Sequence, residues 1–440
     1  MFIKKCAVAL CLATAVSISA NEQVKTDQNA EIKPLSLKDV IKKAIQTHPQ
    51  VKKGQHAQAA ARYDIKAAKS GYLPSLDLRA ATGWEKVTNT SVINEGDMYR
   101  TLNRQESSLT LRQMLFDGFQ TSSRVRRSNL LLSRAENETS DNKLSVALRA
   151  SEAFLEVLRI REQLTLAQEN VNAHQEILKL VEKRFENNMG RQADVIQVKG
   201  RLALAQAQLK REAAAQKGVN ERYFEVVGEF PKTLAAPSDF KTELPKDLIN
   251  AKVTALSTHP ALKASADTVL ATGASINEAK SAYMPRVDLE LSGNENWNLG
   301  GTRGNDDTLM AMFVVNYNIF RGFGDKSAIM SLTEQREQQK EEMLELKRNI
   351  IRDLAVAWHA RDGKLVELSY FIQHMISSEK TLKAYKAQYE IGQRTLFDLL
   401  NSRSEFFRSK ATVIDTKYTN ILSVYQILAN TGELVDKVLK

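Results

Sequence analysis

The chain has 440 residues, of which 62 are Lys or Arg and 52 are Asp or Glu, so its formal net charge is +10 at pH 7. A basic chain can bind nucleic acid, but here basic and acidic residues are interspersed at helical spacing, as on the solvated surface of helices. Composition therefore disfavours a nucleic-acid partner. Long tracts rich in Ala, Leu, Lys, Glu and Gln predict a mainly α-helical protein with a small β part.

Residues 1–20 have the layout of a cleavable secretory signal peptide. Lys4 and Lys5 precede an apolar run at 6–18 that is too short to span a bilayer as a helix. Cys11 leaves a lipoprotein anchor as an alternative, although the leucine before it is bulkier than the usual lipobox residue. Both cysteines of the chain lie in this segment, so the exported protein is expected to have no disulfide.

A flexible segment is expected at 21–35, and the first structural repeat at 36–229. Its first helix breaks at His48-Pro49, because proline lacks an amide hydrogen and disfavours helix in the residue before it. Pro74 ends this helix. No run of about 18 apolar residues occurs here or later in the chain, so the sequence excludes a helical membrane span but not membrane-spanning strands.

A β-hairpin and a very long helix follow in the first repeat. Alternating apolar and polar residues on both sides of a polar loop predict the hairpin at about 75–117. The helical tract at 120–187 would be about 100 Å long, and such a length indicates coiled-coil packing. The chain then reverses near 187–194, and a returning helix completes the repeat.

A linker and a second repeat account for the rest of the chain. The linker at 230–246 contains three prolines, which forbid a continuous helix. The second repeat, at 247–440, has the same order, with a hairpin at about 286–320 and a long helix at 325–390. Six apolar residues are predicted to share one face of the second strand of this hairpin: Leu309, Ala311, Phe313, Val315, Tyr317 and Ile319.

Both long helices carry an apolar stripe. In the second repeat it has the three-and-four spacing of a coiled-coil seam and includes Leu365, Leu368, Ile372 and Met375. The matching stripe of the first repeat includes Leu144, Leu148, Leu155, Leu158, Ile177, Leu178, Val181 and Phe185. Neither helix can bury its stripe alone, so both are predicted to pack on partners.

The sequence repeats itself over a long distance. Thr47-His48-Pro49 recurs 211 residues later at 258–260, and segment 68–78 recurs with few changes at 279–289. This period is far too long for a solenoid of small repeats, so it indicates internal duplication of a whole unit.

The four strands that result from this duplication cannot close a membrane barrel, since known barrels begin at eight strands. Three copies would supply twelve strands without an unpaired edge.

Several motifs together resemble the TolC family of outer-membrane channels over essentially the whole mature chain. They are the two His-Pro helices, the two Lys-Ser-x-Tyr-x-Pro entries to hairpins, the two Phe-x-Gly exits, and a Tyr-x-x-Gly turn at 389–392 that continues into Asp-x-Leu at 398–400. The resemblance implies a homotrimer in the Gram-negative outer membrane, with a 12-stranded β-barrel and a long α-helical barrel that extends through the periplasm.

The resemblance also implies passive conduction and no cofactor. The implied partners are outer-membrane lipid, a periplasmic adaptor (membrane fusion protein) and an inner-membrane ABC or RND transporter. The segment at 190–195 resembles members that serve type I secretion of large adhesins. Multidrug efflux with an RND pump is the main alternative, and a periplasmic coiled-coil adaptor is a weaker one, because an adaptor gives no reason for duplicated apolar hairpins. No phosphate loop, nucleophile elbow or metal signature suggests an enzyme.

By the same resemblance, a periplasmic gate lies at the two helix turns. Asp194 would accept hydrogen bonds from Tyr389 and Arg394, and these polar links would hold the entrance closed. Alternative roles are helix initiation for Asp194 and a solvated surface for Arg394. Asp398 would form an acidic ring at the entrance constriction, although its Thr-x-x-Asp context also fits a helix start. Asn401, one helical turn later, stands where the family often has a second acidic residue, which weakens any cation site.

Other residues have structural explanations. Asn188 occupies the turn position that matches Gly392, and asparagine substitutes well for glycine at positive φ; Gly190 lies at a different position within its turn. Trp84 and Trp297, near strand ends, are candidate interfacial anchors or packing residues. The repeated histidines of the His-Pro motifs lack other ligands at metal-binding spacing, so we expect them to belong to the helix break.

Overall fold

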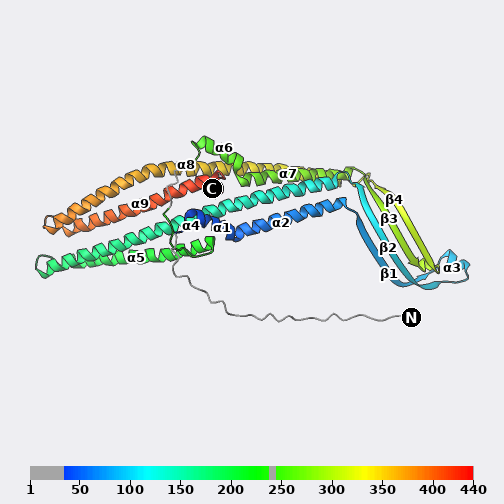
Figure 1. The fold of residues 1–440 in the computed structure, drawn as a ribbon, viewed down its shortest axis with the longest axis horizontal. Coiled ribbons are helices and arrows are strands. Elements are labelled where there is room, and N and C mark those ends of the chain that lie inside the picture. The colour runs from blue at the N-terminus through cyan, green and yellow to red at the C-terminus, as the bar shows by residue number, and fades with distance from the viewer. Residues whose placement is uncertain (1–33, 237–243, 440) are drawn as a thin grey trace.

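The computed structural model describes residues 34–236 and 244–439. The predicted signal peptide at 1–20, and the flexible segment as far as residue 33, lie outside the described residues. The described chain is mostly helical with one four-stranded sheet at one end (Figure 1), which confirms the predicted fold class. Within these residues, no helix is long and apolar enough to cross a membrane.

The same elements occur twice in the same order. The first set is α1 (Leu37–Thr47), α2 (Pro49–Lys69), η1 (Ser70–Tyr72), β1 (Ser75–Val87), α3 (Thr90–Asn94), β2 (Arg100–Phe116), α4 (Gln120–Glu186) and α5 (Gln192–Val227). The second set is α6 (Leu248–Thr258), α7 (Pro260–Lys280), η2 (Ser281–Tyr283), β3 (Arg286–Trp297), η3 (Leu299–Gly301), β4 (Asn305–Asn316), α8 (Gly324–Glu390) and α9 (Leu396–Asn430), followed by α10 (Leu434–Leu439).

The His-Pro motifs separate two helices in each repeat. His48 has extended backbone angles, and its Nδ1 accepts a hydrogen bond of 3.1 Å from the backbone N–H of Gln50. His259 caps α7 in the same way through the N–H of Ala261, at 3.3 Å. Burial lowers the pKa of His259 to about 4, so this imidazole is neutral near pH 7 and can accept the bond. The repeated histidines therefore act as helix N-caps.

The sheet joins the two repeats. Its strand order is β1-β2-β3-β4 with antiparallel pairing throughout, so β2 of the first hairpin pairs with β3 of the second, and the pairing shifts at a bulge between Met114 and Phe116. β1 and β4 each keep one unpaired edge. The predicted apolar face of β4 is shorter than expected, because the strand ends at Asn316, and Tyr317 and Ile319 lie beyond it.

The loop ends of the two hairpins are interlocked, and their short helices α3 and η3 were not predicted. Asn89 Nδ2 donates to the Gly300 carbonyl at 2.8 Å. Arg100, which is ion-paired with Asp97 at 2.6 Å, donates to the Gly301 carbonyl at 3.2 Å. The loops predicted only as polar thus hold the two hairpins together.

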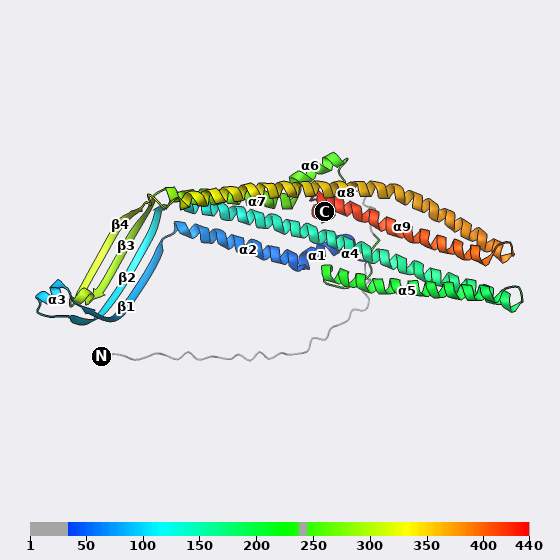
Figure 2. The ribbon, with the colours of Figure 1, turned by 180° about the vertical axis from the view of Figure 1, so that it is seen from behind.

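The helices continue the sheet as one layer (Figures 1 and 2). Next to the sheet, neighbouring helices follow the order α2, α4, α7, α8, and in the other half the order is α5, α4, α9, α8. The layer therefore has a first edge formed by β1, α2 and α5, and a second edge formed by β4 and α8. The main hydrophobic core lies between these halves, where α1 and α10 pack on α4, α5 and α9 around Phe154, Tyr223 and Tyr425.

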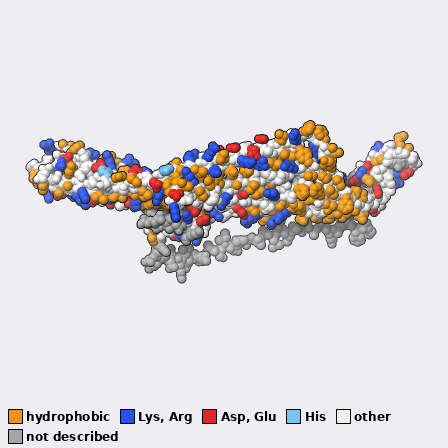
Figure 3. All heavy atoms as spheres, turned by 90° about the horizontal axis from the view of Figure 1, so that it is seen from above, with side chains coloured by type: hydrophobic (Ala, Val, Ile, Leu, Met, Phe, Trp, Pro, Cys, Tyr) orange, Lys and Arg blue, Asp and Glu red, His pale blue; other side chains and the backbone are white. Residues whose placement is uncertain are grey.

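The two predicted coiled-coil stripes have different environments. In α4, which has neighbours on both sides, Leu144, Leu155 and Val181 are almost completely buried. In α8, at the second edge, Leu365 is 43% exposed and Ile372 is 38% exposed. Seen from above, hydrophobic side chains gather where the helical part meets the sheet, and charged side chains are spread over the helices (Figure 3).

Candidate functional site

The two helix turns at the end of the molecule opposite the sheet have the same backbone structure. In the α4–α5 turn, the N–H of Asn188 donates to the Phe185 carbonyl at 3.0 Å. In the α8–α9 turn, the N–H of Gly392 donates to the Tyr389 carbonyl, also at 3.0 Å. Asn188 and Gly392 have φ values of 58° and 81°, as expected for equivalent positions that favour glycine or asparagine.

This equivalence aligns every residue of one turn with a residue of the other. Asp194 matches Asp398, and Gly190 matches Arg394. Gly190 does not have positive φ, but a Cβ atom there would lie only 3.1 Å from the backbone nitrogen of Phe185. At the position where the second turn carries an arginine, the first turn therefore leaves little room for a side chain.

A small hydrophobic cluster, the tip cluster, packs the two turns together. Its buried members come from α4, α5, α8 and α9: Ile177, Val181, Val195, Val198, Tyr389, Leu396, Leu399 and Leu400. Tyr389 is 7% exposed in this cluster. Burial raises the pKa of Tyr389, the Arg184 guanidinium opposes this rise, and the Asp194 carboxylate adds to it. The structure thus brings the predicted pair Tyr389 and Asp194 into the same electrostatic environment.

Arg184, which sequence analysis missed, is a direct polar link between the two helical hairpins. Its Nη1 donates to the Tyr389 carbonyl at 2.8 Å, and its guanidinium carbon lies 4.9 Å from the centre of the Tyr389 ring. An arginine in the last turn of α4 is also expected from the helix dipole alone. Its sequence position therefore gave no signal for this contact.

Arg394 makes its described contacts within its own hairpin. Its Nε donates to Gln388 Oε1 at 3.0 Å, and its guanidinium carbon lies 4.2 Å from the centre of the Tyr385 ring. Its Nη1 is 3.7 Å from Asp398 Oδ2, in a pair of which both members are partly exposed. The link from Arg394 to Asp194 is not among these contacts and stays a prediction.

Asp398 takes part in the helix start that was considered as its alternative role. The Thr395 hydroxyl donates to Asp398 Oδ2 at 2.8 Å, and the Asp398 N–H donates to Thr395 Oγ1 at 3.2 Å. Asn401 is exposed one helical turn later. The first turn has no such cap, since the Arg191 side chain at the start of α5 makes no capping hydrogen bond.

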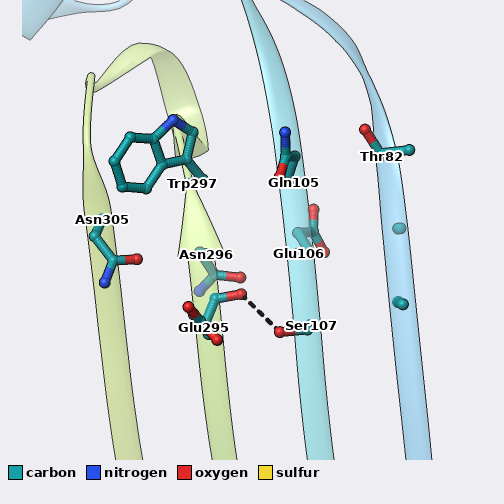
Figure 4. Close-up of a pocket in the computed structure, with 10 residues that line it drawn as sticks. Thr82, Gln105, Glu106, Ser107, Glu295, Asn296, Trp297 and Asn305 are labelled. Carbon is teal, nitrogen blue, oxygen red and sulfur yellow. Dashed lines mark hydrogen bonds between the residues drawn. The ribbon is translucent and has the colours of Figure 1, made fainter. Parts of the chain in front are cut away.

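Trp84 and Trp297 lie near the loop ends of β1 and β3. Trp84 is 78% exposed and Trp297 is 49% exposed, so Trp84 is largely uncovered in one chain and Trp297 is about half covered, and their interfacial role stays a prediction. Trp297 borders a hollow on the sheet whose other labelled members are mostly polar (Figure 4). There the Ser107 hydroxyl donates to the Glu295 carbonyl at 3.4 Å.

Comparison with known proteins defines the class of protein. The family described as outer membrane efflux protein matches residues 40–222 and 253–433, one segment in each repeat. The chain belongs to this family, which confirms the resemblance to TolC channels. It is therefore an outer-membrane efflux channel protein and not an enzyme, and it extends from the outer membrane into the periplasm.

Individual relatives are distant but match over most of their length. The chain is 24% identical to the outer membrane efflux protein BepC of Brucella suis, with 84% of this chain and 79% of that one covered. It is 23% identical to the alkaline protease secretion protein AprF of Pseudomonas aeruginosa, with 87% and 82% covered. It is 22% identical to the outer membrane protein TolC of Escherichia coli, with 92% and 83% covered.

Solved channel structures share the fold. The CmeC outer membrane channel of Campylobacter jejuni superposes with a TM-score of 0.80 at 14% identity, covering 90% of this chain and 86% of that one. The open state of the MtrE outer membrane channel of Neisseria gonorrhoeae gives a TM-score of 0.77 at 16% identity, covering 92% and 90%. The layer with two free edges is thus the fold of one channel subunit.

Proposed function

We propose that this channel serves type I secretion of a large protein such as an adhesin. In this proposal it receives the protein from an inner-membrane ABC transporter through a periplasmic adaptor. The main support is the α4–α5 turn at 190–195, whose sequence resembles that of secretion channels, together with similarity to AprF, a protein named for protease secretion, over 87% of the chain. Multidrug efflux with an RND pump is the second candidate, because BepC is named an efflux protein.

The proposed working unit is a homotrimer built head to tail. Pairing β4 of one copy with β1 of the next would satisfy both free strand edges and give the twelve strands expected from the sequence. Apolar side chains on β4 are exposed in one chain, with Leu309, Phe313 and Val315 63–89% exposed, and would contact outer-membrane lipid. The long helices would continue the assembly as a duct through the periplasm.

The proposed gate is at the tip cluster, where the duct would narrow. Tyr389 and Asp194 would link the two hairpins, Arg394 would add a second donor to Asp194, and Asp398 with Asn401 would face the constriction. Arg394 and Asp398 are partly exposed, and polar pairs at such positions contribute only about 0 to 1 kcal/mol each. Several weak links can keep an entrance closed and still be broken when an adaptor binds.

A deletion experiment distinguishes the two candidate functions. Cells that lack this chain should lose one or more very large proteins from the medium and cell surface, as measured by mass spectrometry, while drug susceptibility stays unchanged. Re-expression of the chain should restore export. Increased susceptibility to several drugs with an unchanged secreted proteome would instead support multidrug efflux.

A further inference from the structure

The contact between α4 and α7 inside one chain is a template for a contact between copies. It joins the long helix of one repeat to the short helix of the other. Asp267 on α7 accepts hydrogen bonds from Ser133 Oγ at 2.7 Å and from Asn137 Nδ2 at 2.8 Å, both on α4. In a head-to-tail ring, the equivalent pair is α8 of one copy and α2 of the next, which are the free edges next to the sheet.

The duplication gives the residues at that second contact. α4 and α8 both have 67 residues and start 204 positions apart, whereas α2 and α7 both have 21 residues and start 211 positions apart. Ser133 and Asn137 therefore correspond to Glu337 and Glu341, and Asp267 corresponds to His56. All three of these edge residues are at least partly exposed in a single chain.

Charge on the two edges is complementary around these positions. α2 has five basic residues and one acidic residue, and Lys52 lies one helical turn before His56. The stretch 334–345 of α8 has five acidic residues and two basic ones, and Glu345 lies one turn after Glu341. No described ion pair involves Lys52, Glu341 or Glu345. Glu337 is already paired with Arg336 and Lys340 of its own helix, each at 2.9 Å. At the heights that the template aligns, the charges without a described ion partner are therefore Lys52 on one edge and Glu341 and Glu345 on the other.

We infer that Lys52 and His56 of one copy dock against Glu337, Glu341 and Glu345 of the next copy, and that this contact sets the register of the assembly. The inference rests on the proposed head-to-tail trimer and names a polar contact within it. Complementary charges make the contact between two such edges specific. If the edges met in another register, or if two identical edges met, like charges would lie opposite one another.

Cysteine crosslinking tests the position of the contact. With the predicted signal peptide removed the chain has no other cysteine, so His56→Cys with Glu341→Cys should form disulfides under oxidation. Because α4 and α7 separate α2 from α8 within one chain, these disulfides should join different copies into covalent dimers and trimers. Moving the second cysteine to Glu342, which lines a cavity with α7 residues, should reduce crosslinking by roughly fivefold or more.

Charge reversal tests the role of the contact in assembly. Lys52→Glu with His56→Glu should lower the fraction of trimer that survives mild heating in detergent by roughly fivefold, and adding Glu341→Lys with Glu345→Lys should restore most of it. Lys53→Glu with Glu342→Lys is the matched control, because both residues line the same cavity rather than the outer edges. Trimers that form no crosslink and resist all reversals would overturn the inference but leave the channel proposal intact. A chain that stays monomeric would overturn both.

Discussion

The α4–α5 and α8–α9 turns have the same backbone but different side-chain contacts. Both reverse a 67-residue helix through one residue at positive φ, at Asn188 and at Gly392. The second turn has a capping pair at Thr395 and Asp398, whereas the first turn has none. The two repeats thus share the backbone structure that reverses the chain but differ in the side-chain hydrogen bonds that stabilise it.

The polar contacts between the two turns are also unequal. Arg184 from the first hairpin contacts the backbone and ring of Tyr389 in the second, but among the described residues the contacts of Arg394 lie within its own hairpin. Close to the turns, the two hairpins are therefore joined by the tip cluster and by Arg184, whereas farther from the turns α4 and α9 are joined by other polar pairs such as Glu169 with Lys410. In the proposed gate, Arg394 would form an additional contact, between the hairpins or between copies, when the entrance closes.

Locking the two turns together should have the largest effect. Asp194→Cys with Tyr389→Cys should form a disulfide under oxidation, because Tyr389 and Val195, the residue after Asp194, are both buried in the tip cluster and no other cysteine remains after the predicted signal. Conductance in planar bilayers and export from cells should fall nearly to background, and a reducing agent should restore both. Each single cysteine variant is the control. Efficient crosslinking with unchanged conductance would exclude a gate at this position.

Removing the link at Arg184 should have the next largest effect. Arg184→Ala loses a charge-assisted hydrogen bond and a cation–π contact with Tyr389, which together contribute about 1 to 2 kcal/mol to the contact between the hairpins. Basal conductance should rise roughly 5- to 30-fold if opening separates the hairpins. Lys183→Ala is the matched control on the preceding residue. Equal conductance of the two variants would show that Arg184 only stabilises the tip.

The sequence predicted the helix breaks, the two hairpins and the long helices because each has a strong local signal. Proline after histidine marks the break, period-2 alternation marks the strands, and period-3.6 patterns mark the helices. The same local signals extended the face of β4 to Tyr317 and Ile319, because alternation continues past the residue where pairing with β3 ends. The extent of a strand depends on its partner, which a local pattern does not include.

The contacts of the site were harder to predict for the same reason. Arg184 is far from Tyr389 in sequence, and the two meet only because α4 and α8 pack at their ends through the tip cluster. By contrast, the cap at Asp398 depends on the four consecutive residues 395–398, and their Thr-x-x-Asp spacing predicts it as an alternative role for Asp398. Local hydrogen bonds can be predicted from spacing, whereas contacts between hairpins require the packing of four helices.

Arg394→Ser should have a smaller effect than Arg184→Ala. Its pair with Asp398 is partly exposed at 3.7 Å, and such pairs contribute about 0 to 1 kcal/mol. Basal conductance should rise only a few-fold, and the difference from the unaltered channel should shrink in high salt because exposed charges are screened. Arg191→Ala, which removes a cation from the other turn without adding a capping side chain, is the comparison variant. An unchanged closed state would assign Arg394 to the surface, as its contacts within one hairpin also allow.

Exchanging the capping arrangement of the two turns should have the smallest effect and would test their difference directly. Thr395→Ala removes the hydroxyl that accepts from the Asp398 N–H, and loss of such a cap costs about 1 kcal/mol of local stability. Arg191→Thr puts a capping residue at the equivalent position before α5, three residues ahead of Asp194, and should stabilise that turn by a similar amount. Hydrogen exchange should therefore become faster at the start of α9 in the first variant and slower at the start of α5 in the second. If both variants exchange like the unaltered protein, the tip cluster alone fixes the turns, and the absence of a cap in the first turn has no part in its opening.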